Sequence, residues 1–208
     1  SSIGVDYGIL LGKQPLGLLI ETEAKEQLPD LFIDVSLRDG LKRRLAWGRP
    51  MVIGTTGLSQ EDWGLLREEA KRVPIFYASN FSLGMALLKK IAADLARLFP
   101  GEVHIEETHH EKKKDAPSGS ALSLAGAIEK VRPGRKVAIT SVRLGEVVGE
   151  HVLKFTADEE NIELSHEARS RRVFALGALE AAKFLLGKPP GIYGMDELLA
   201  EKKEAGAS

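Results

Sequence analysis

The stretch LFIDVSLRDGLKRRLAWGRPMVIGTTGLSQEDWGLLREEAKRVPIFY, residues 31–77, decides the fold. Three short apolar runs within it predict buried strands: 31–35, 51–53 and 73–77. The segments between the runs predict two helices, one over residues 37–47 and one that begins at Ser59. Strands and helices that alternate in this order are typical of a parallel, doubly wound sheet. We therefore expect an α/β domain with a Rossmann-like fold.

The pattern changes after Ser82, where apolar residues at helical spacing predict a long helix that ends at Pro100. Alternating or apolar runs then predict four strands: 103–110, 137–144, 151–156 and 161–166. Only four residues join the last two, so these two should pair antiparallel. We expect a second, α+β domain with an open, mostly antiparallel sheet.

The chain then returns to helices, at residues 171–186 and from Met195 onward. These helices predict a return to the first domain. The expected domains are therefore residues 1–81 with 171–208 for dinucleotide binding, and residues 82–170 for substrate binding and tetramerisation.

Composition limits the function classes. The 208 residues carry a net charge of −1 with 43% hydrophobic and 28% charged residues, so we expect no nucleic-acid partner. No apolar run approaches the roughly 18 residues that span a membrane. The absence of cysteine fits a reducing compartment, and we expect a cytoplasmic protein without disulfides. Adjacent histidines on a strand diverge, so no metal site is expected.

Residues 106–120 (EETHHEKKKDAPSGS) concentrate the candidate chemistry. Strand alternation places His109 on the face that carries Val103 and Ile105, and His110 on the other face. Ser118 can cap the helix that follows. Lysines and histidines beside a helix N-terminus favour a small anion with acid groups near it. The simpler alternatives are a solvated lysine run, a structural histidine pair and a plain helix cap.

These residues resemble a known family. Residues 109–119 (HHEKKKDAPSG) are similar to the signature His-His-x-x-Lys-x-Asp-Ala-Pro-Ser-Gly of the dihydrodipicolinate reductases. Four more stretches resemble that family: 52–57 (VIGTTG), 78–82 (ASNFS), 145–151 (GEVVGEH) and 170–178 (SRRVFALGA). The resemblance implies an oxidoreductase that uses NADH or NADPH to reduce 4-hydroxy-tetrahydrodipicolinate in the diaminopimelate route of lysine biosynthesis. It also implies a homotetramer.

The resemblance assigns roles to individual residues. His109 and Lys113 become the candidate acids. The candidates for holding the dicarboxylate substrate are His110, Gly119 and Ser120, where the family usually has Thr in place of Ser120. Contacts to the nicotinamide half of the cofactor are expected from Gly54, Thr55, Thr56, Ala78, Ser79, Asn80 and Phe81.

The family begins with a strand, a glycine-rich phosphate-binding turn, a helix and a second strand, none of which is recognisable in residues 1–17. We therefore expect a sheet that lacks its first strands, and weak dinucleotide binding by these 208 residues alone. The residues that select NADH or NADPH would lie in that unit. Two alternatives stay open: a non-catalytic homologue that assembles or binds dicarboxylates, and a nicotinamide dehydrogenase for another small acid.

Overall fold

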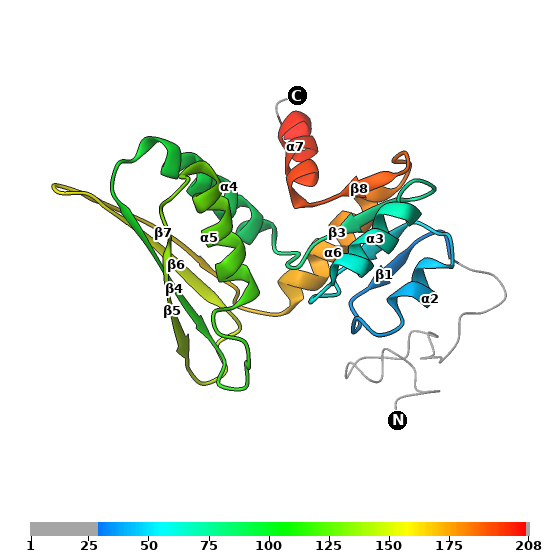
Figure 1. Cartoon of the computed structure of the whole chain (residues 1–208), viewed down its shortest axis with the longest axis horizontal. Coiled ribbons are helices and arrows are strands. Elements are labelled where there is room, and N and C mark those ends of the chain that lie inside the picture. The colour runs from blue at the N-terminus through cyan, green and yellow to red at the C-terminus, as the bar shows by residue number, and fades with distance from the viewer. Residues whose placement is uncertain (1–28, 207–208) are drawn as a thin grey trace. The chain divides into compact units, whose positions relative to one another are not determined.

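The computed structural model describes residues 29–206, and residues 31–206 belong to one compact unit (Figure 1). The interpretation of residues 1–17 lies outside the described residues. None of the described helices is long and apolar enough to cross a membrane.

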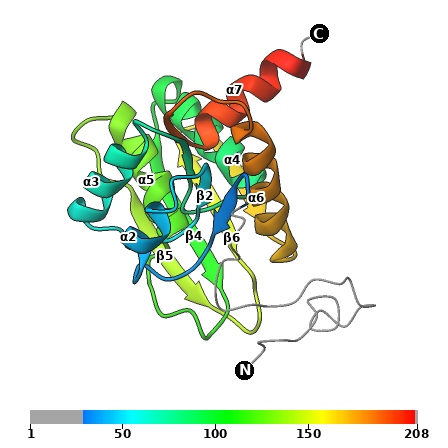
Figure 2. The same cartoon turned by 90° about the vertical axis from the view of Figure 1, so that its right-hand side faces the viewer.

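The first sheet is parallel, as the sequence predicts. Its strands, in spatial order, are β1 (Phe32–Asp34), β2 (Met51–Ile53), β3 (Pro74–Tyr77) and β8 (Gly191–Tyr193). Helices cover both faces, which confirms the doubly wound architecture (Figure 2). On one face lie α2 (Leu41–Leu45) and α3 (Gln60–Glu69), and on the other α6 (Arg172–Leu185) and α7 (Met195–Gly206).

Three expectations for this sheet were wrong in detail. The helix predicted over residues 37–47 begins only at Leu41, because Gly40 adopts a left-handed conformation (φ 82°) that a helix interior does not hold. The predicted buried run 31–35 is not buried throughout, since Ile33 in β1 is 41% exposed and Val35, which follows β1, is 69% exposed. The sequence analysis missed β8, which pairs with β3 and has only three residues, too few to give a periodic signal.

The second sheet is mixed and has the order β5-β4-β6-β7. These strands are β4 (Glu102–His109), β5 (Ala138–Arg143), β6 (Glu150–Thr156) and β7 (Asn161–Glu167). Two of its three pairings are antiparallel, which confirms the predicted predominance. The sheet is nevertheless not a continuous antiparallel run over residues 137–166. Strand β4 lies between β5 and β6 and pairs parallel with β5, because helix α5 (Gly119–Val131) provides a crossover between them.

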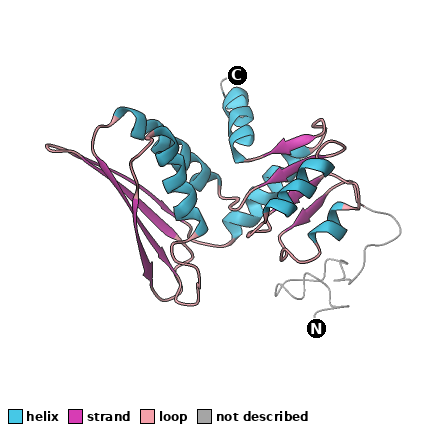
Figure 3. Cartoon of the chain, in the orientation of Figure 1, coloured by secondary structure: helices cyan, strands magenta, loops and turns pink. Residues whose placement is uncertain are grey.

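One face of the second sheet packs against α5 and α4 (Leu83–Leu98), as Figures 1 and 3 show. The core between them is apolar and includes Leu88, Leu124, Ile105 and Phe155. The chain passes between the sheets at residues 78–82 and 168–171. Gly177 of α6 lies directly against the first of these segments, where a Cβ atom would be 1.8 Å from the carbonyl oxygen of Phe81. The domain boundaries given above remain predictions.

Candidate active site

Strand β4 delivers two functional side chains to the inner face of the second sheet. Glu107 and His109 continue the face of Val103 and Ile105, and all four are buried, as the alternation predicts. The carboxylate of Glu107 is 0% exposed. It accepts hydrogen bonds from His109 Nδ1 and from both terminal nitrogens of Arg143, which lies on the neighbouring strand β5 (3.0 and 3.2 Å).

The environment of His109 sets its protonation. Burial lowers the pKa of His109, while the hydrogen bond and charge of Glu107 act in the opposite direction. The ring of His151, on β6, packs edge-on against His109 with 5.2 Å between centroids. Burial also lowers the pKa of His151, to about 4, and lowers that of His166 on β7. These imidazoles are therefore mostly neutral at pH 7 without a ligand.

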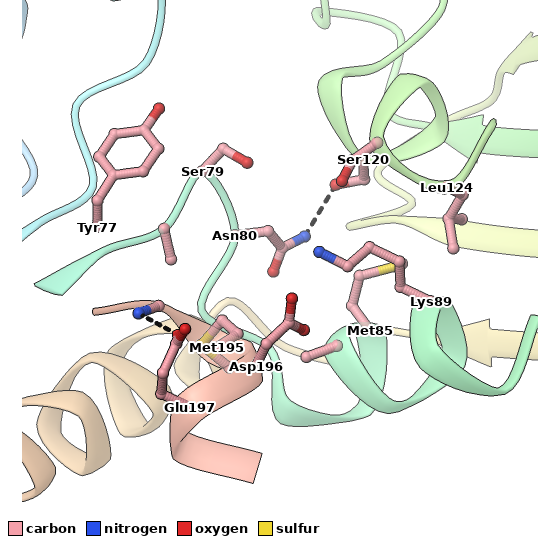
Figure 4. A pocket seen from close by; sticks show the side chains of 14 residues that line it. Tyr77, Ser79, Asn80, Met85, Lys89, Ser120, Leu124, Met195, Asp196 and Glu197 are labelled. Atoms are coloured by element: carbon pink, nitrogen blue, oxygen red, sulfur yellow. Dashed lines mark hydrogen bonds between the residues drawn. The ribbon is translucent and has the colours of Figure 1, made fainter. Parts of the chain in front are cut away.

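The N-terminus of α5 lies beside these histidines. Ser118 caps the helix, as predicted, by accepting a hydrogen bond from the backbone N–H of Ala121. The backbone N–H of Ser118 donates a hydrogen bond to the carboxylate of Glu107 (3.2 Å). This bond ties the start of α5 to strand β4. Ser120 is the second residue of α5. Its hydroxyl accepts a hydrogen bond from the side-chain amide nitrogen of Asn80 (2.8 Å), which Figure 4 shows.

Among Lys112, Lys113 and Lys114, only Lys113 has a partly buried side chain, and its ion-pair partner belongs to the same signature segment. Its ammonium group lies 2.8 Å from a carboxylate oxygen of Asp115 and holds the pKa of Asp115 below its ordinary value. Lys112 and Lys114 are exposed. His110 lies 3.3 Å from a terminal nitrogen of Arg171.

A cavity of about 250 Å³ brings many of the predicted site residues together. His109, His110, Lys113 and Ser120 line it, together with three predicted cofactor residues: Ser79, Asn80 and Phe81. Gly119 does not line it. The space around Gly119 is open, since an added Cβ would meet no atom within 4 Å.

A neighbouring cavity of similar volume shares Ser79, Asn80 and Ser120 with the first. Ala78 lines only this second cavity, together with Lys89, whose side chain points into it (Figure 4). The Asn80–Ser120 hydrogen bond therefore lies at the boundary of the two cavities.

The remaining predicted cofactor residues lie at the carboxyl ends of the parallel strands but line neither cavity. Gly54 follows β2, and a Cβ atom there would be 2.7 Å from the ring of Phe81. The hydroxyl of Thr55 is buried and donates to the carbonyl oxygen of Ser36 (3.0 Å), after β1. Thr56 is exposed. This edge of the sheet is where doubly wound folds bind nucleotides.

Sequence reasoning missed two histidines of the cavity, His151 and His166. Each shares the inner face of its strand with core residues, Leu153 and Phe155 on β6 and Leu164 on β7. The alternation that correctly placed His109 would have found them. Among residues 29–206, no cluster of histidine and carboxylate side chains is arranged to hold a metal ion.

Comparisons with known proteins identify the family of the chain. Residues 1–81 match the protein family described as dihydrodipicolinate reductase, N-terminus, and residues 83–199 match dihydrodipicolinate reductase, C-terminus. The 4-hydroxy-tetrahydrodipicolinate reductase of Magnetococcus marinus is 38% identical, over 96% of this chain and 85% of its own length. The enzyme of the same name from Xanthomonas campestris pv. campestris is 45% identical, over 82% of this chain and 73% of its own length.

A solved structure, the dipicolinate-bound dihydrodipicolinate reductase of Paenisporosarcina sp. TG-14, superimposes with a TM-score of 0.70. It is 27% identical to this chain, and the match covers 81% of this chain and 73% of the other. The matched ranges thus include both sheets. The chain belongs to the dihydrodipicolinate reductase family.

Proposed function

We propose that this chain is an NAD(P)H-dependent reductase that converts 4-hydroxy-tetrahydrodipicolinate to tetrahydrodipicolinate in the diaminopimelate route of lysine biosynthesis. The observation that carries the proposal is the cavity in which His109, His110, Lys113 and Ser120 meet. The family membership supports the same reaction and favours it over the non-catalytic homologue and over a dehydrogenase for another acid.

The cavity suits a planar dicarboxylate. Lys113 provides a cation, and the N-terminus of α5 beside Ser120 provides a partial positive charge. Cations and helix N-termini are the groups that bind carboxylates in proteins. We assign His110, Lys113, Gly119 and Ser120 to substrate binding. Gly119 is included because its open backbone leaves room for a carboxylate to approach.

Reduction of the substrate also requires a proton. His109 and Lys113 are the proposed donors because both have exchangeable protons and both line the cavity. His109 is mostly neutral without a ligand, but a bound dicarboxylate adds negative charge beside it. That negative charge raises the pKa of His109, so His109 would take up a proton when the substrate binds.

The carboxyl ends of β2 and β3 fit the nicotinamide half of NADH or NADPH. The nucleotide, when bound, supplies the hydride. Gly54, Thr55 and Thr56 would form one wall of its site, and residues 78–81 would form the wall toward the substrate. Ser79, Asn80 and Phe81 already line the cavity with His109 and Lys113, so this chain would hold the ring of the nucleotide next to the substrate.

The test is nucleotide oxidation followed by absorbance, with NADH and NADPH in turn and with 4-hydroxy-tetrahydrodipicolinate as the acceptor. Oxidation that requires the substrate and is lost in Lys113→Ala supports the proposal. Substrate-independent oxidation, or full activity of that variant, would contradict it.

Two finer proposals accompany this function. We propose a homotetramer that associates through the second sheet, whose face opposite α4 and α5 has no covering helix in the described part of the chain. Light scattering tests it, and a monomer at micromolar concentration would contradict it. We also propose a cytoplasmic location, where the nucleotides and the metabolites of lysine biosynthesis occur.

A further inference from the structure

A fully buried carboxylate lies behind the candidate acid. Glu107 is 0% exposed and is not part of the cavity lining, whereas His109 and Lys113 are. The proposed reaction gives it no direct contact with a ligand. A buried charge is retained only where other groups compensate for the loss of water, so the partners of Glu107 indicate its role.

All the partners of this carboxylate are hydrogen-bond donors. One oxygen accepts from His109 Nδ1 and from Arg143, and the other accepts from Arg143 and from the backbone N–H of Ser118. Burial acts to raise the pKa of Glu107, but hydrogen bonds from Arg143, Ser141 and His109 outweigh it and hold the pKa below its ordinary value. An ionised carboxylate satisfies this set of donors, whereas the NH₂ group of an amide would oppose two of them.

The carboxylate determines the orientation of His109. Because Nδ1 faces an acceptor that carries no proton, Nδ1 must be protonated, and the other nitrogen, Nε2, carries the exchangeable proton of the charged form. Nε2 points toward Gly149 at the cavity, where a Cβ atom on Gly149 would lie 3.0 Å away. The ring therefore presents Nε2 on the ligand side.

The same ion pair holds the segment that carries Lys113. The guanidinium group of Arg143 also donates to the carbonyl oxygens of Lys113 (3.3 Å) and Asp115 (2.5 Å). A shift of Glu107 or Arg143 would therefore move both candidate acids.

We propose that Glu107 is a positioning residue for the reductase reaction, which fixes the Nε2 face of His109 toward the substrate and, through Arg143, anchors the Lys113 segment. The inference rests on the proposed function, because it assumes that His109 and Lys113 act on a dicarboxylate in this cavity. It adds Glu107 and Arg143 to the functional residues, and neither is in the signature run of residues 109–119.

The unaltered protein provides the first test. Nitrogen chemical shifts of the His109 ring, measured by NMR above its titration, report which nitrogen carries the proton. The proposal requires the proton on Nδ1 and an unprotonated Nε2. A proton on Nε2 would overturn it, whether or not any variant folds.

The second test compares Glu107→Gln with Glu61→Gln, an exposed residue in the first turn of α3 that lies outside the second sheet. We expect Glu107→Gln to lower kcat by about tenfold or more, within the roughly 10²- to 10⁴-fold that a general acid contributes, with a smaller change in KM. Because the carboxylate charge favours protonated His109, the variant should also shift the His109 titration to lower pH.

Glu61→Gln should change neither quantity. An unchanged kcat and an unchanged His109 titration in folded Glu107→Gln would overturn the inference while leaving the proposed function intact. Failure of the unaltered protein to bind pyridine-2,6-dicarboxylate, a planar analogue of the substrate, would instead refute the proposed function.

Discussion

Replacing Arg143 by Met tests the buried ion pair by removing only its positive partner. The side chain of Arg143 is 19% exposed, and Met fills a similar volume without charge. In the variant, Glu107 has two options: to remain ionised without its main partner, or to take up a proton. The option with the lower free-energy cost determines the loss of stability. For a fully buried carboxylate that option is protonation.

The magnitude follows from the ordinary pKa of the carboxyl, 4.5. Holding such a group protonated at pH 7 costs about 3.4 kcal/mol, since each unit is about 1.36 kcal/mol. At pH 5 the same step costs only about 0.7 kcal/mol. A loss of about 3 kcal/mol is a large part of the roughly 5–15 kcal/mol that stabilises a typical domain.

The sign of the pH dependence follows from the two folded states. With Arg143 present, the folded pKa of Glu107 lies below 4.5, so its stabilisation is complete above pH 4.5 and is lost as the pH falls through the folded pKa. In Arg143→Met the folded pKa rises above 4.5. The difference in free energy of unfolding between the two proteins should therefore be largest at neutral pH and should shrink toward pH 5.

Urea unfolding at pH 7 and pH 5 measures this difference. Arg97→Met is the matched control, because Arg97 pairs with Asp94 on the surface and such pairs contribute at most about 1 kcal/mol. Equal losses in the two variants at pH 7 would refute the reasoning. A large loss at Arg143 that does not vary with pH would show that packing, not charge, is responsible.

Three further predictions concern the cavity. Lys113→Ala should lower turnover by about a hundredfold or more, whereas alanine at either neighbouring lysine should change it little, as steady-state rates will show. Gly149→Ala places a methyl group 3.0 Å from His109 Nε2, so it should displace the ring and reduce turnover, whereas Gly126→Ala, which meets no atom within 4 Å, should leave turnover intact. Binding of pyridine-2,6-dicarboxylate at pH 7 should take up protons, because the ligand raises the pKa of His109. Calorimetry in buffers of different ionisation enthalpy measures this uptake, and equal heats in all buffers would contradict it.

Features set by neighbouring residues could be predicted from the sequence. Ser59 and Ser118 are helix caps in the structure because a hydroxyl before a helix bonds the N–H groups of its first turn. The inward direction of His109 followed from strand alternation alone. Each of these depends on residues close together in the chain, so a local pattern is sufficient.

Features that depend on the pairing of distant segments could not be predicted. Arg143 reaches Glu107 because β5 pairs with β4 in a register that places His109 opposite Arg143. The sequence analysis assigned both strands but not their adjacency. Without that register, Glu107 had no visible partner. The exposure of β1 was misjudged for the same reason, since neighbours in the sheet decide burial, whereas β8 was missed because its three residues give no periodic signal.

The most direct test of the central claim is calorimetric titration with pyridine-2,6-dicarboxylate, because this measurement needs no nucleotide. We predict one site per chain. Lys113→Ala should weaken binding by about ten- to a hundredfold, the roughly 1.5–3 kcal/mol of a hydrogen bond to a charged group, and Lys112→Ala should leave the affinity unchanged. No binding, or equal affinities in all three proteins, would contradict the assignment of this cavity to the dicarboxylate substrate.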